Sequence, residues 1–509
     1  MASMPEATNN YKKLHEISRQ TRILEGIDSL LHWDQETYMP EDAAAIRAEQ
    51  QKIMAGLVHK GRIAKPFVNA LAKLIDIKTG KVLVKGLGSA KNAALKVWRR
   101  EYLKETALPT QFVEDFAKLT SQSVLVWRSA RQENSFRRFA PYLEKIIQMN
   151  RKKADLLGYK EHPYDALLDA YEPEMTTKRI TPIFSDLKQF LVGLIKKIQQ
   201  KTQIDDHFLF GKFSESKQMA FSQKILKGMH YDMRRGRLDF SIHPFSSAAH
   251  PTDSRITTRI HPSSLLSNVR SVMHEAGHGL YEMGLPINEY GSPLGEHASL
   301  GIHESQSRWW ETRIGQSLPF WEHYFPILQK EFKEFQKVSL KEFYKASNKV
   351  EPTFIRVEAD EVTYNLHVIL RFEIEKALIE GSLPIKEIPE AWNAKFKELL
   401  GLVPSTDAEG CLQDIHWSLG SFGYFPTYTL GNLYAAQFFA TFEQAFPKWE
   451  KSVAEGELEF IKEWLEKSIF QFGRQYSSFE LVEKVSDAPF SSKSFCHYLE
   501  TKYKDIYRF

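Results

Sequence analysis

Helical periodicity runs through almost the whole sequence and is the feature that most restricts the fold. Near the N-terminus, Leu14, Ile17, Leu24, Ile27 and Leu31 recur at spacings of three, four and seven residues, which places them on one helix face. Similar patterns occupy Phe112–Leu125, Leu143–Leu157, Ile183–Ile198, Phe320–Phe335 and Phe460–Phe472. Strand-like alternation is confined to two short runs, Leu238–Ile242 and Arg255–Ile260. The sequence therefore predicts a mainly α protein with a small β-sheet.

The composition indicates an ordinary globular chain. Its 509 residues are 42% hydrophobic and 26% charged, which is enough to bury a large core. No repeat of fixed period divides the chain, so we expect a single domain spanning residues 1–509. Three segments rich in Gly, Lys, Pro or Thr are predicted loops: Ile77–Asn92, Tyr171–Thr177 and Gly401–Gly410.

Charge and cysteine content argue against several classes of protein. The net charge is only +4, and the densest basic cluster of the central chain, RRGR at Arg234–Arg237, is typical of a solvated loop. Cys411 and Cys496 are the only cysteines, too few for a disulfide framework or a thiolate-rich metal site. Neither a signal-like N-terminus nor an apolar stretch of about 20 residues is present. We expect a cytoplasmic protein that binds neither nucleic acid nor membranes.

The segment SVMHEAGHGLYE, Ser271–Glu282, contains the pattern H-E-x-x-H. In a helix, His274 and His278 stand one turn apart on one face, so both can direct a ring nitrogen at one ion. Glu275 lies about 100° around the helix, where it can take a proton from a water at that ion, as in H-E-x-x-H metallopeptidases. The helix is predicted to end at Gly284.

A third ligand is needed, because with 17 histidines in 509 residues this pattern arises by chance in roughly a few per cent of chains. Leu300–Glu311 predicts a second helix, and Glu304, at its middle, is our first candidate ligand. Glu296, nearer the preceding loop, is the second. The other acids considered are Glu282, Glu289 and Glu311. Two histidines and one glutamate leave the fourth position of a zinc ion open to water, which is the mark of a catalytic site; Co²⁺ is the alternative ion.

Five further motifs surround this pattern. They are HPF (His243–Phe245), DSRIT (Asp253–Thr257), HESQ (His303–Gln306), IRVEAD (Ile355–Asp360) and GCLQDIHW (Gly410–Trp417). Singly, each has a structural explanation; Arg356 and Asp360, for example, could form a surface ion pair. Together with HEAGH, and in this order, they resemble the M32 metallocarboxypeptidase family of the thermostable carboxypeptidase Taq type. The likeness covers nearly the full chain, with two less typical segments: Ile77–Asn92, and Ser246–Asp253, where a glycine-richer loop is expected.

The resemblance implies an elongated helical body with a deep cleft, a small sheet beside the zinc site, and a homodimer. It also implies zinc-dependent release of C-terminal amino acids from peptides, with broad preference. Arg255 and Arg356 occupy motif arginines that the resemblance associates with the substrate's terminal carboxylate, which a guanidinium can bind through two hydrogen bonds.

The remaining roles are assigned by chemistry. We predict Glu275 as the general base, and His416 and Tyr424 as donors to the oxyanion. Asp360 and Asp414 are the candidate acceptors that would fix the tautomers of the ligand histidines.

Two alternatives remain. A zinc oligopeptidase that cleaves internal peptide bonds would use the same chemistry. A non-catalytic binding protein on a peptidase fold would usually have lost the base or a ligand, whereas His274, Glu275, His278 and Glu304 are all present.

Overall fold

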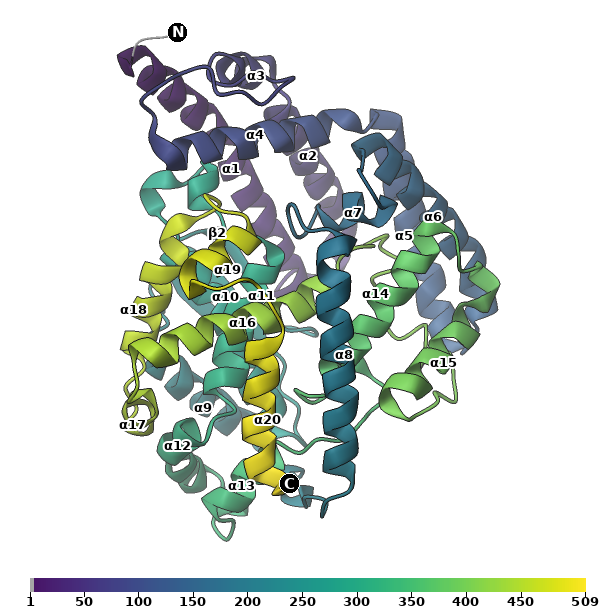
Figure 1. The fold of residues 1–509 in the computed structure, drawn as a ribbon, viewed down its shortest axis with the longest axis vertical. Helices are drawn as coiled ribbons and strands as arrows, with labels where there is room; N and C mark the ends of the chain where they lie inside the picture. The colour runs from purple at the N-terminus through teal and green to yellow at the C-terminus, as the bar shows by residue number, and fades with distance from the viewer. Residues whose placement is uncertain (1–3) are drawn as a thin grey trace. The chain divides into compact units, whose positions relative to one another are not determined.

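A computed structural model of the protein describes residues 4–509, which are mostly helical with one three-stranded sheet (Figure 1). The predicted mainly α fold is confirmed. The chain divides into two compact units. The first contains the segment ending at Thr106, Asp206–Ser347 and Phe438–Ala488, and the second contains Ala107–Asp205, Asn348–Gln437 and Pro489–Phe509. The single domain over residues 1–509 stays a prediction.

The first unit begins with the long helix α1 (Met4–Thr37). Leu14 is buried in a cluster with Leu71 and Trp98, but Ile27 is 42% exposed, so the predicted apolar face packs only in part. The other helices of this unit are α2 (Ala44–Arg62), α3 (Lys65–Ala72), α4 (Gly88–Ala107), α9 (Glu215–Gly228), α10 (Leu265–Gly284), α11 (Leu300–Arg308), α12 (Leu318–Glu331), α13 (Leu340–Ser347), α17 (Trp449–Ala454), α18 (Glu459–Ser468) and α19 (Ser478–Ser486).

The sheet belongs to the first unit. Its central strand β3 (Asp253–Thr258) pairs in parallel with β1 (Gly236–Phe240) and antiparallel with β2 (Ser246–His250). β1 and β3 overlap the two predicted strands. β2 corrects the expectation of a loop over Ser246–Asp253: its Ser and Ala residues show no apolar alternation, and pairing with β3 makes this segment a strand.

Helices α10 and α11 pack against each other, and β3 packs against α10. α10 ends at Gly284, as predicted, because Leu285 adopts an extended conformation. The hydroxyl of Ser299 caps α11 by accepting the backbone N–H of Ile302 at 3.0 Å. α11 continues into a π-helical turn, Trp309–Ile314, so the predicted helix is present but its last residues follow a wider spiral.

In the second unit, α8 (Thr177–Gln199) and α20 (Lys493–Tyr507) pack along each other (Figure 1). α14 (Tyr364–Glu380), buried around most of its circumference, contacts several neighbouring helices. The remaining helices are α5 (Thr110–Gln132), α6 (Phe136–Leu157), α7 (Pro163–Leu168) and α15 (Ile388–Leu400), while α16 (Pro426–Ala445) begins in this unit and ends in the first.

The predicted helices over 112–125, 143–157 and 183–198 are confirmed within α5, α6 and α8. Those over 320–335 and 460–472 end as 3₁₀ turns after α12 and α18. The predicted loop Ile77–Asn92 is wrong for its last residues, because α4 starts at Gly88.

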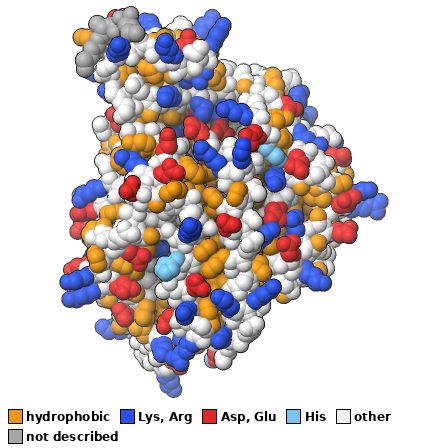
Figure 2. Space-filling view, viewed as in Figure 1, with side chains coloured by type: hydrophobic (Ala, Val, Ile, Leu, Met, Phe, Trp, Pro, Cys, Tyr) orange, Lys and Arg blue, Asp and Glu red, His pale blue; other side chains and the backbone are white. Residues whose placement is uncertain are grey.

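Charges of both signs are interspersed on the face shown in Figure 2. Arg234 and Arg237 of the RRGR cluster are exposed and pair with Asp232 and Asp239. The predicted loop is wrong for Gly236 and Arg237, which belong to β1. Within residues 4–509, no helix combines the length and apolar character needed to cross a membrane.

Candidate active site

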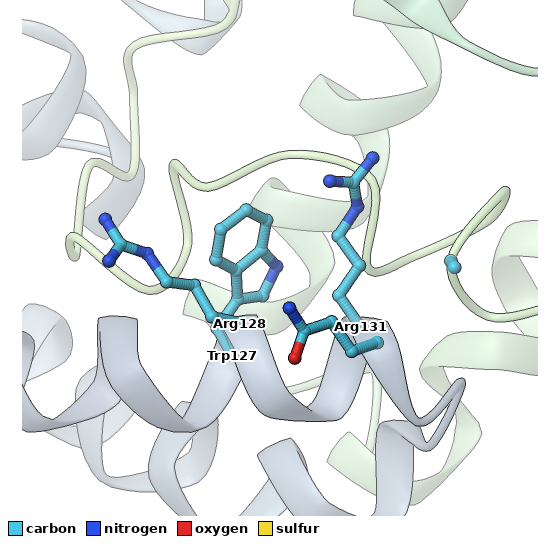
Figure 3. A pocket seen from close by; sticks show the side chains of 5 residues that line it. Trp127, Arg128 and Arg131 are labelled. Carbon is cyan, nitrogen blue, oxygen red and sulfur yellow. The ribbon is translucent and has the colours of Figure 1, made fainter.

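A surface pocket on α5 of the second unit lacks catalytic chemistry. It has a volume of about 270 Å³ and is lined by Trp127, Arg128, Arg131, Gln132 and Ala408. The two arginines extend from the helix on either side of the indole (Figure 3). Because this lining contains no carboxylate, imidazole or nucleophile, this pocket is not a candidate active site.

In the first unit, α10 and α11 bring the three predicted metal ligands together. His274 and His278 of α10 and Glu304 of α11 each offer a ligand atom, and these atoms lie within 4.8 Å of one another. Oε2 of Glu304 lies 3.6 Å from Nε2 of His274 and 3.5 Å from Nε2 of His278.

This spacing suits an ion better than a hydrogen-bonded cluster. N–H···O hydrogen bonds span about 2.7–3.2 Å. Two ligands of a tetrahedral zinc ion, each about 2.0–2.1 Å from the metal, lie roughly 3.4 Å apart. Two imidazoles and one carboxylate are also a ligand set that zinc takes in catalytic sites. The residues present therefore fit a divalent cation.

The local field also favours a cation. Burial lowers the pKa of His274, but Glu304 and Glu311 outweigh it and raise that pKa to about 9. Burial raises the pKa of Glu304, but the two histidines outweigh it and hold that pKa below its ordinary value. The carboxylates thus create a negative potential where the ring nitrogens converge.

Glu275 lies next to His274 on α10 and is only 7% exposed. Burial raises the pKa of its carboxyl to about 7, although His274 lowers it. A carboxyl group with such a pKa exchanges protons readily near neutral pH, as a general base must.

A carboxylate orients the first ligand histidine. Nδ1 of His274 lies 2.8 Å from Oε2 of Glu311, which also accepts a hydrogen bond from Nη1 of Arg308 at 2.7 Å. Because Glu311 holds the N–H on Nδ1, Nε2 is the nitrogen that would give up its proton and offer a lone pair to an ion. Glu311 lies in the π-helical turn, a feature common at functional sites.

The candidate acceptors Asp360 and Asp414 bond other groups. Asp360 accepts from the hydroxyl and backbone N–H of Thr363, and Asp414 pairs with Arg356 and Arg371. The prediction that they fix the ligand histidines is therefore wrong. Sequence order does not reveal which acid faces a given helix.

The second ligand histidine has a different neighbour. Nδ1 of His278 is in hydrogen-bond contact with Nδ1 of His303, whose Nε2 lies 2.9 Å from Oε1 of Glu282. Burial lowers the pKa of His303 to about 4, so this imidazole is neutral near pH 7. Glu296, our second candidate ligand, instead pairs with Arg474 at 2.8 Å.

Part of the guanidinium of Arg255, on β3, already donates hydrogen bonds within the first unit. Its Nε and Nη2 donate to Asp253 at 2.7 and 2.9 Å, and its guanidinium lies 4.5 Å from the ring centroid of Trp33. Within residues 4–509 the structure gives Nη1 no hydrogen bond, so this nitrogen can bind a further acceptor.

In the second unit, Arg356 belongs to a buried ionic cluster. Its Nε and Nη2 donate to Oδ1 of Asp414 at 3.1 and 2.8 Å, and its Nη1 donates to the hydroxyl of Tyr364 at 3.0 Å. Nε of Arg371 donates to Oδ2 of Asp414 at 2.7 Å. Burial raises the pKa of Asp414, but the two arginines hold it far below its ordinary value. The alternative of a surface pair between Arg356 and Asp360 is wrong.

His416 lies beside this cluster. Its Nδ1 is 4.0 Å from Oδ1 of Asp414, its Nε2 is 3.3 Å from the hydroxyl of Tyr428, and its ring centroid is 5.4 Å from that of Tyr424. Burial lowers the pKa of His416 to about 4, so the ring is neutral near pH 7 and carries one N–H donor.

The structure thus gathers the predicted residues into two groups. His274, Glu275, His278, Glu304 and Arg255 belong to the first unit; Arg356, His416 and Tyr424 belong to the second.

Sequence reasoning missed the neighbours of both groups. His303 stands beside Glu304 within HESQ, so its place in a motif was a usable signal. Arg371 follows Tyr364 by two helical turns on α14, a spacing that indicates a shared face but no partner. Nothing in the sequence pattern pointed to Tyr428.

Comparisons with known proteins identify the family to which this chain belongs. The family model described as Carboxypeptidase Taq (M32) metallopeptidase matches residues 13–503. Thermostable carboxypeptidase 1 of Thermus thermophilus is 39% identical, with 99% of each chain covered. Carboxypeptidase 1 of Bacillus subtilis is 34% identical, with 94% of this chain and 95% of that protein covered.

Solved structures show the same fold. The M32 carboxypeptidase from Deinococcus radiodurans superposes with a TM-score of 0.95 at 34% identity, over 98% of this chain and 100% of that one. Metallocarboxypeptidase 1 of Trypanosoma cruzi gives a TM-score of 0.92 at 32% identity, over 99% and 100% of the two chains. This chain belongs to the M32 family of metallocarboxypeptidases, which are peptide hydrolases.

Proposed function

We propose that this chain is a zinc-dependent carboxypeptidase that releases C-terminal amino acids from peptides with broad preference. The observation that carries the proposal is the spacing of 3.5–3.6 Å between one carboxylate oxygen and two imidazole nitrogens, beside the buried Glu275. Zinc is the proposed ion, at one per chain, and Co²⁺ is the alternative.

In this proposal His274, His278 and Glu304 hold the ion. When bound, zinc supplies Lewis acidity that polarises the scissile carbonyl and lowers the pKa of water. Glu275 accepts a proton from the attacking water and delivers it to the nitrogen of the departing amino acid.

His416 and Tyr424 are the proposed donors to the oxyanion of the tetrahedral intermediate. A neutral imidazole and a phenol can each donate a hydrogen bond there without introducing a competing charge.

In this proposal the arginines make the enzyme prefer the C-terminal end of a peptide, because they bind its terminal carboxylate. Arg356 and Arg371 carry two positive charges against the single negative charge of Asp414, so this buried cluster has one net positive charge for a terminal carboxylate. Arg255 offers a second guanidinium through Nη1, which donates no hydrogen bond within the described part of the chain. An oligopeptidase that cleaves internal bonds would not need such a charge, and this alternative is not favoured.

A pair of peptides tests the proposal. The protein is loaded with Zn²⁺ and given one short peptide with a free C-terminus and the same peptide with an amidated C-terminus. The proposal predicts stepwise release of C-terminal amino acids from the free form, and rates at least about tenfold lower for the amidated form. Equal cleavage of both at an internal bond would support the oligopeptidase instead.

The family resemblance also leads us to propose a homodimer located in the cytoplasm, with no nucleic-acid or membrane partner. Sedimentation velocity of the zinc-loaded protein tests the first point, and fractionation of cells that express it tests the second.

A further inference from the structure

A second cluster of potential ligands adjoins His278. Glu282, His297 and His303 each offer a ligand atom within 4.8 Å of the others. Oε1 of Glu282 lies 2.9 Å from Nδ1 of His297 and 2.9 Å from Nε2 of His303. Glu282 is 8% exposed, and it follows His278 by one turn on α10.

The distances distinguish this cluster from the proposed zinc site. Two N···O separations of 2.9 Å, both to the same oxygen, are ordinary hydrogen bonds. In the zinc site the corresponding separations are 3.5 and 3.6 Å, which leave room for an ion between the atoms. The second cluster is therefore held together by hydrogen bonds and not by a metal ion.

The contact between this cluster and His278 fixes which ring nitrogen donates and which accepts in each hydrogen bond. A ring that binds metal through Nε2 carries its proton on Nδ1 and must donate it. That nitrogen meets Nδ1 of His303, and the two rings lie 25° from parallel with centroids 4.5 Å apart, as rings that meet at their edges do. A neutral imidazole that accepts at Nδ1 donates from Nε2, and Nε2 of His303 faces Glu282.

We propose that His303 and Glu282 form a positioning relay for His278. In this relay Glu282 fixes the ring of His303 by a hydrogen bond, and His303 in turn fixes the ring of His278 by accepting a hydrogen bond from it. This inference rests on the proposed function, in which His278 is a ligand. α10 then carries His274, His278 and Glu282 at four-residue intervals, the first two as ligands and the third as the anchor of the relay.

The two ligand histidines are oriented differently as a result. His274 meets a carboxylate directly, through Glu311 at 2.8 Å, whereas His278 reaches one through an intervening ring. The backbone of His303 also contributes a hydrogen bond to His278. The relay requires the side chain of His303 in addition to this backbone contact. A substitution at residue 303 removes the side-chain contact and keeps the backbone contact, so it distinguishes their effects.

His297 provides a matched control. It bonds the same oxygen of Glu282 as His303 does, and within residues 4–509 the structure gives it no hydrogen bond to His278. The variants His303→Phe, His303→Gln and His297→Phe are compared with the unmodified protein. Zn²⁺ affinity is measured by competition with a chelating dye, the number of ions per chain by elemental analysis, and ligand geometry by the visible absorption of bound Co²⁺. Thermal unfolding of the metal-stripped proteins checks the fold.

The relay predicts one Zn²⁺ per chain throughout. Affinity should fall by about 10–100-fold in His303→Phe, the usual effect of losing an outer partner of a metal ligand, with a changed Co²⁺ spectrum. His303→Gln should recover part of this loss, because an amide can accept from His278 and donate to Glu282. His297→Phe should change affinity by less than about threefold, since its only role in the relay is to hold Glu282.

Equal affinities for His303→Phe and His297→Phe, with one ion per chain, would overturn the relay and leave the proposed function intact. Two ions per chain, with the second lost in both variants, would show that the cluster is a metal site and also overturn the relay. Absence of Zn²⁺ binding by the unmodified protein would defeat the proposed function itself. If His303→Phe does not fold, His303→Ala decides: it keeps the backbone of residue 303 and removes the ring, and only the relay predicts an affinity loss larger than that of His297→Phe.

Discussion

A Cβ atom on Gly277 would lie 2.5 Å from the carbonyl oxygen of Gln306 and 2.7 Å from the Cα atom of Ser307. Gly277 lies on α10 between the two ligand histidines, and the backbone that it meets belongs to α11, just after Glu304. The absence of a side chain at this one position therefore sets the distance between the imidazole ligands and the carboxylate ligand.

Gly277→Ala should accordingly loosen the metal site. Because the obstructing atoms are backbone, the helices must separate, at a cost of about 1–3 kcal/mol of stability. We expect a lower unfolding temperature and Zn²⁺ affinity weakened at least about tenfold. Gly56→Ala on α2 is the control, since nothing lies within 4 Å of its added Cβ and alanine favours a helix. Full Zn²⁺ affinity in Gly277→Ala would refute this account of the helix contact.

Glu275→Gln should separate metal binding from catalysis. The amide keeps the size of the side chain but cannot accept the proton of water, so kcat should fall about 10²–10⁴-fold. Zinc content should stay at one ion per chain, because Glu275 is not a proposed ligand. Undiminished hydrolysis by a zinc-loaded variant would remove the role given to this carboxylate.

Arg356→Lys should weaken recognition of the chain end. Lysine keeps the charge but loses the fork that donates to both Asp414 and Tyr364. We expect kcat/KM on a peptide with a free C-terminus to fall about 10–100-fold, with a smaller change for its amidated twin. Arg234→Lys, at an exposed arginine, is the control. An equal loss on both peptides would show that Arg356 has only a structural role.

Stability should depend on pH through the buried Glu375 of the second unit. Burial raises the pKa of this carboxyl from 4.5 to about 7, although Tyr164, Gly423 and Trp417 donate hydrogen bonds to it. Between these two values the folded protein holds a proton that the unfolded chain has released. The stabilising effect is thus complete below about pH 4.5 and is lost as the pH rises through 7, by at most about 3 kcal/mol.

Glu375→Gln cannot ionise and should lack this dependence. The difference in unfolding free energy between the variant and the unmodified protein, both stripped of metal, should shift in favour of the variant between pH 5 and pH 8. Denaturant unfolding measures it. A difference that stays constant over this range would mean that Glu375 is ionised in the folded protein throughout.

The sequence was sufficient where one helix carries the chemistry. The four-residue spacing of His274 and His278 predicted a shared face, because helical geometry is local. Glu304 was chosen for its mid-helix position, but the packing of α11 against α10 is what brings it to the histidines. The end of α10 at Gly284 followed from the same local rules.

Features that depend on tertiary contacts were not predictable. Glu311 reaches His274 from a π-helical turn that no side-chain pattern announces, and β2 is a strand because of its partner. Helix packing decides that Glu311 and His303, and not Asp360 and Asp414, contact the ligand histidines. The positions of these residues in the sequence do not reveal which of them the packing brings close.

The most direct test of the proposed zinc centre is a crystal structure of the zinc-loaded protein, with anomalous scattering measured on both sides of the zinc absorption edge. We predict one anomalous peak per chain, about 2.0–2.1 Å from Nε2 of His274, Nε2 of His278 and a carboxylate oxygen of Glu304. A peak among Glu282, His297 and His303 instead, or no peak near α10, would contradict it.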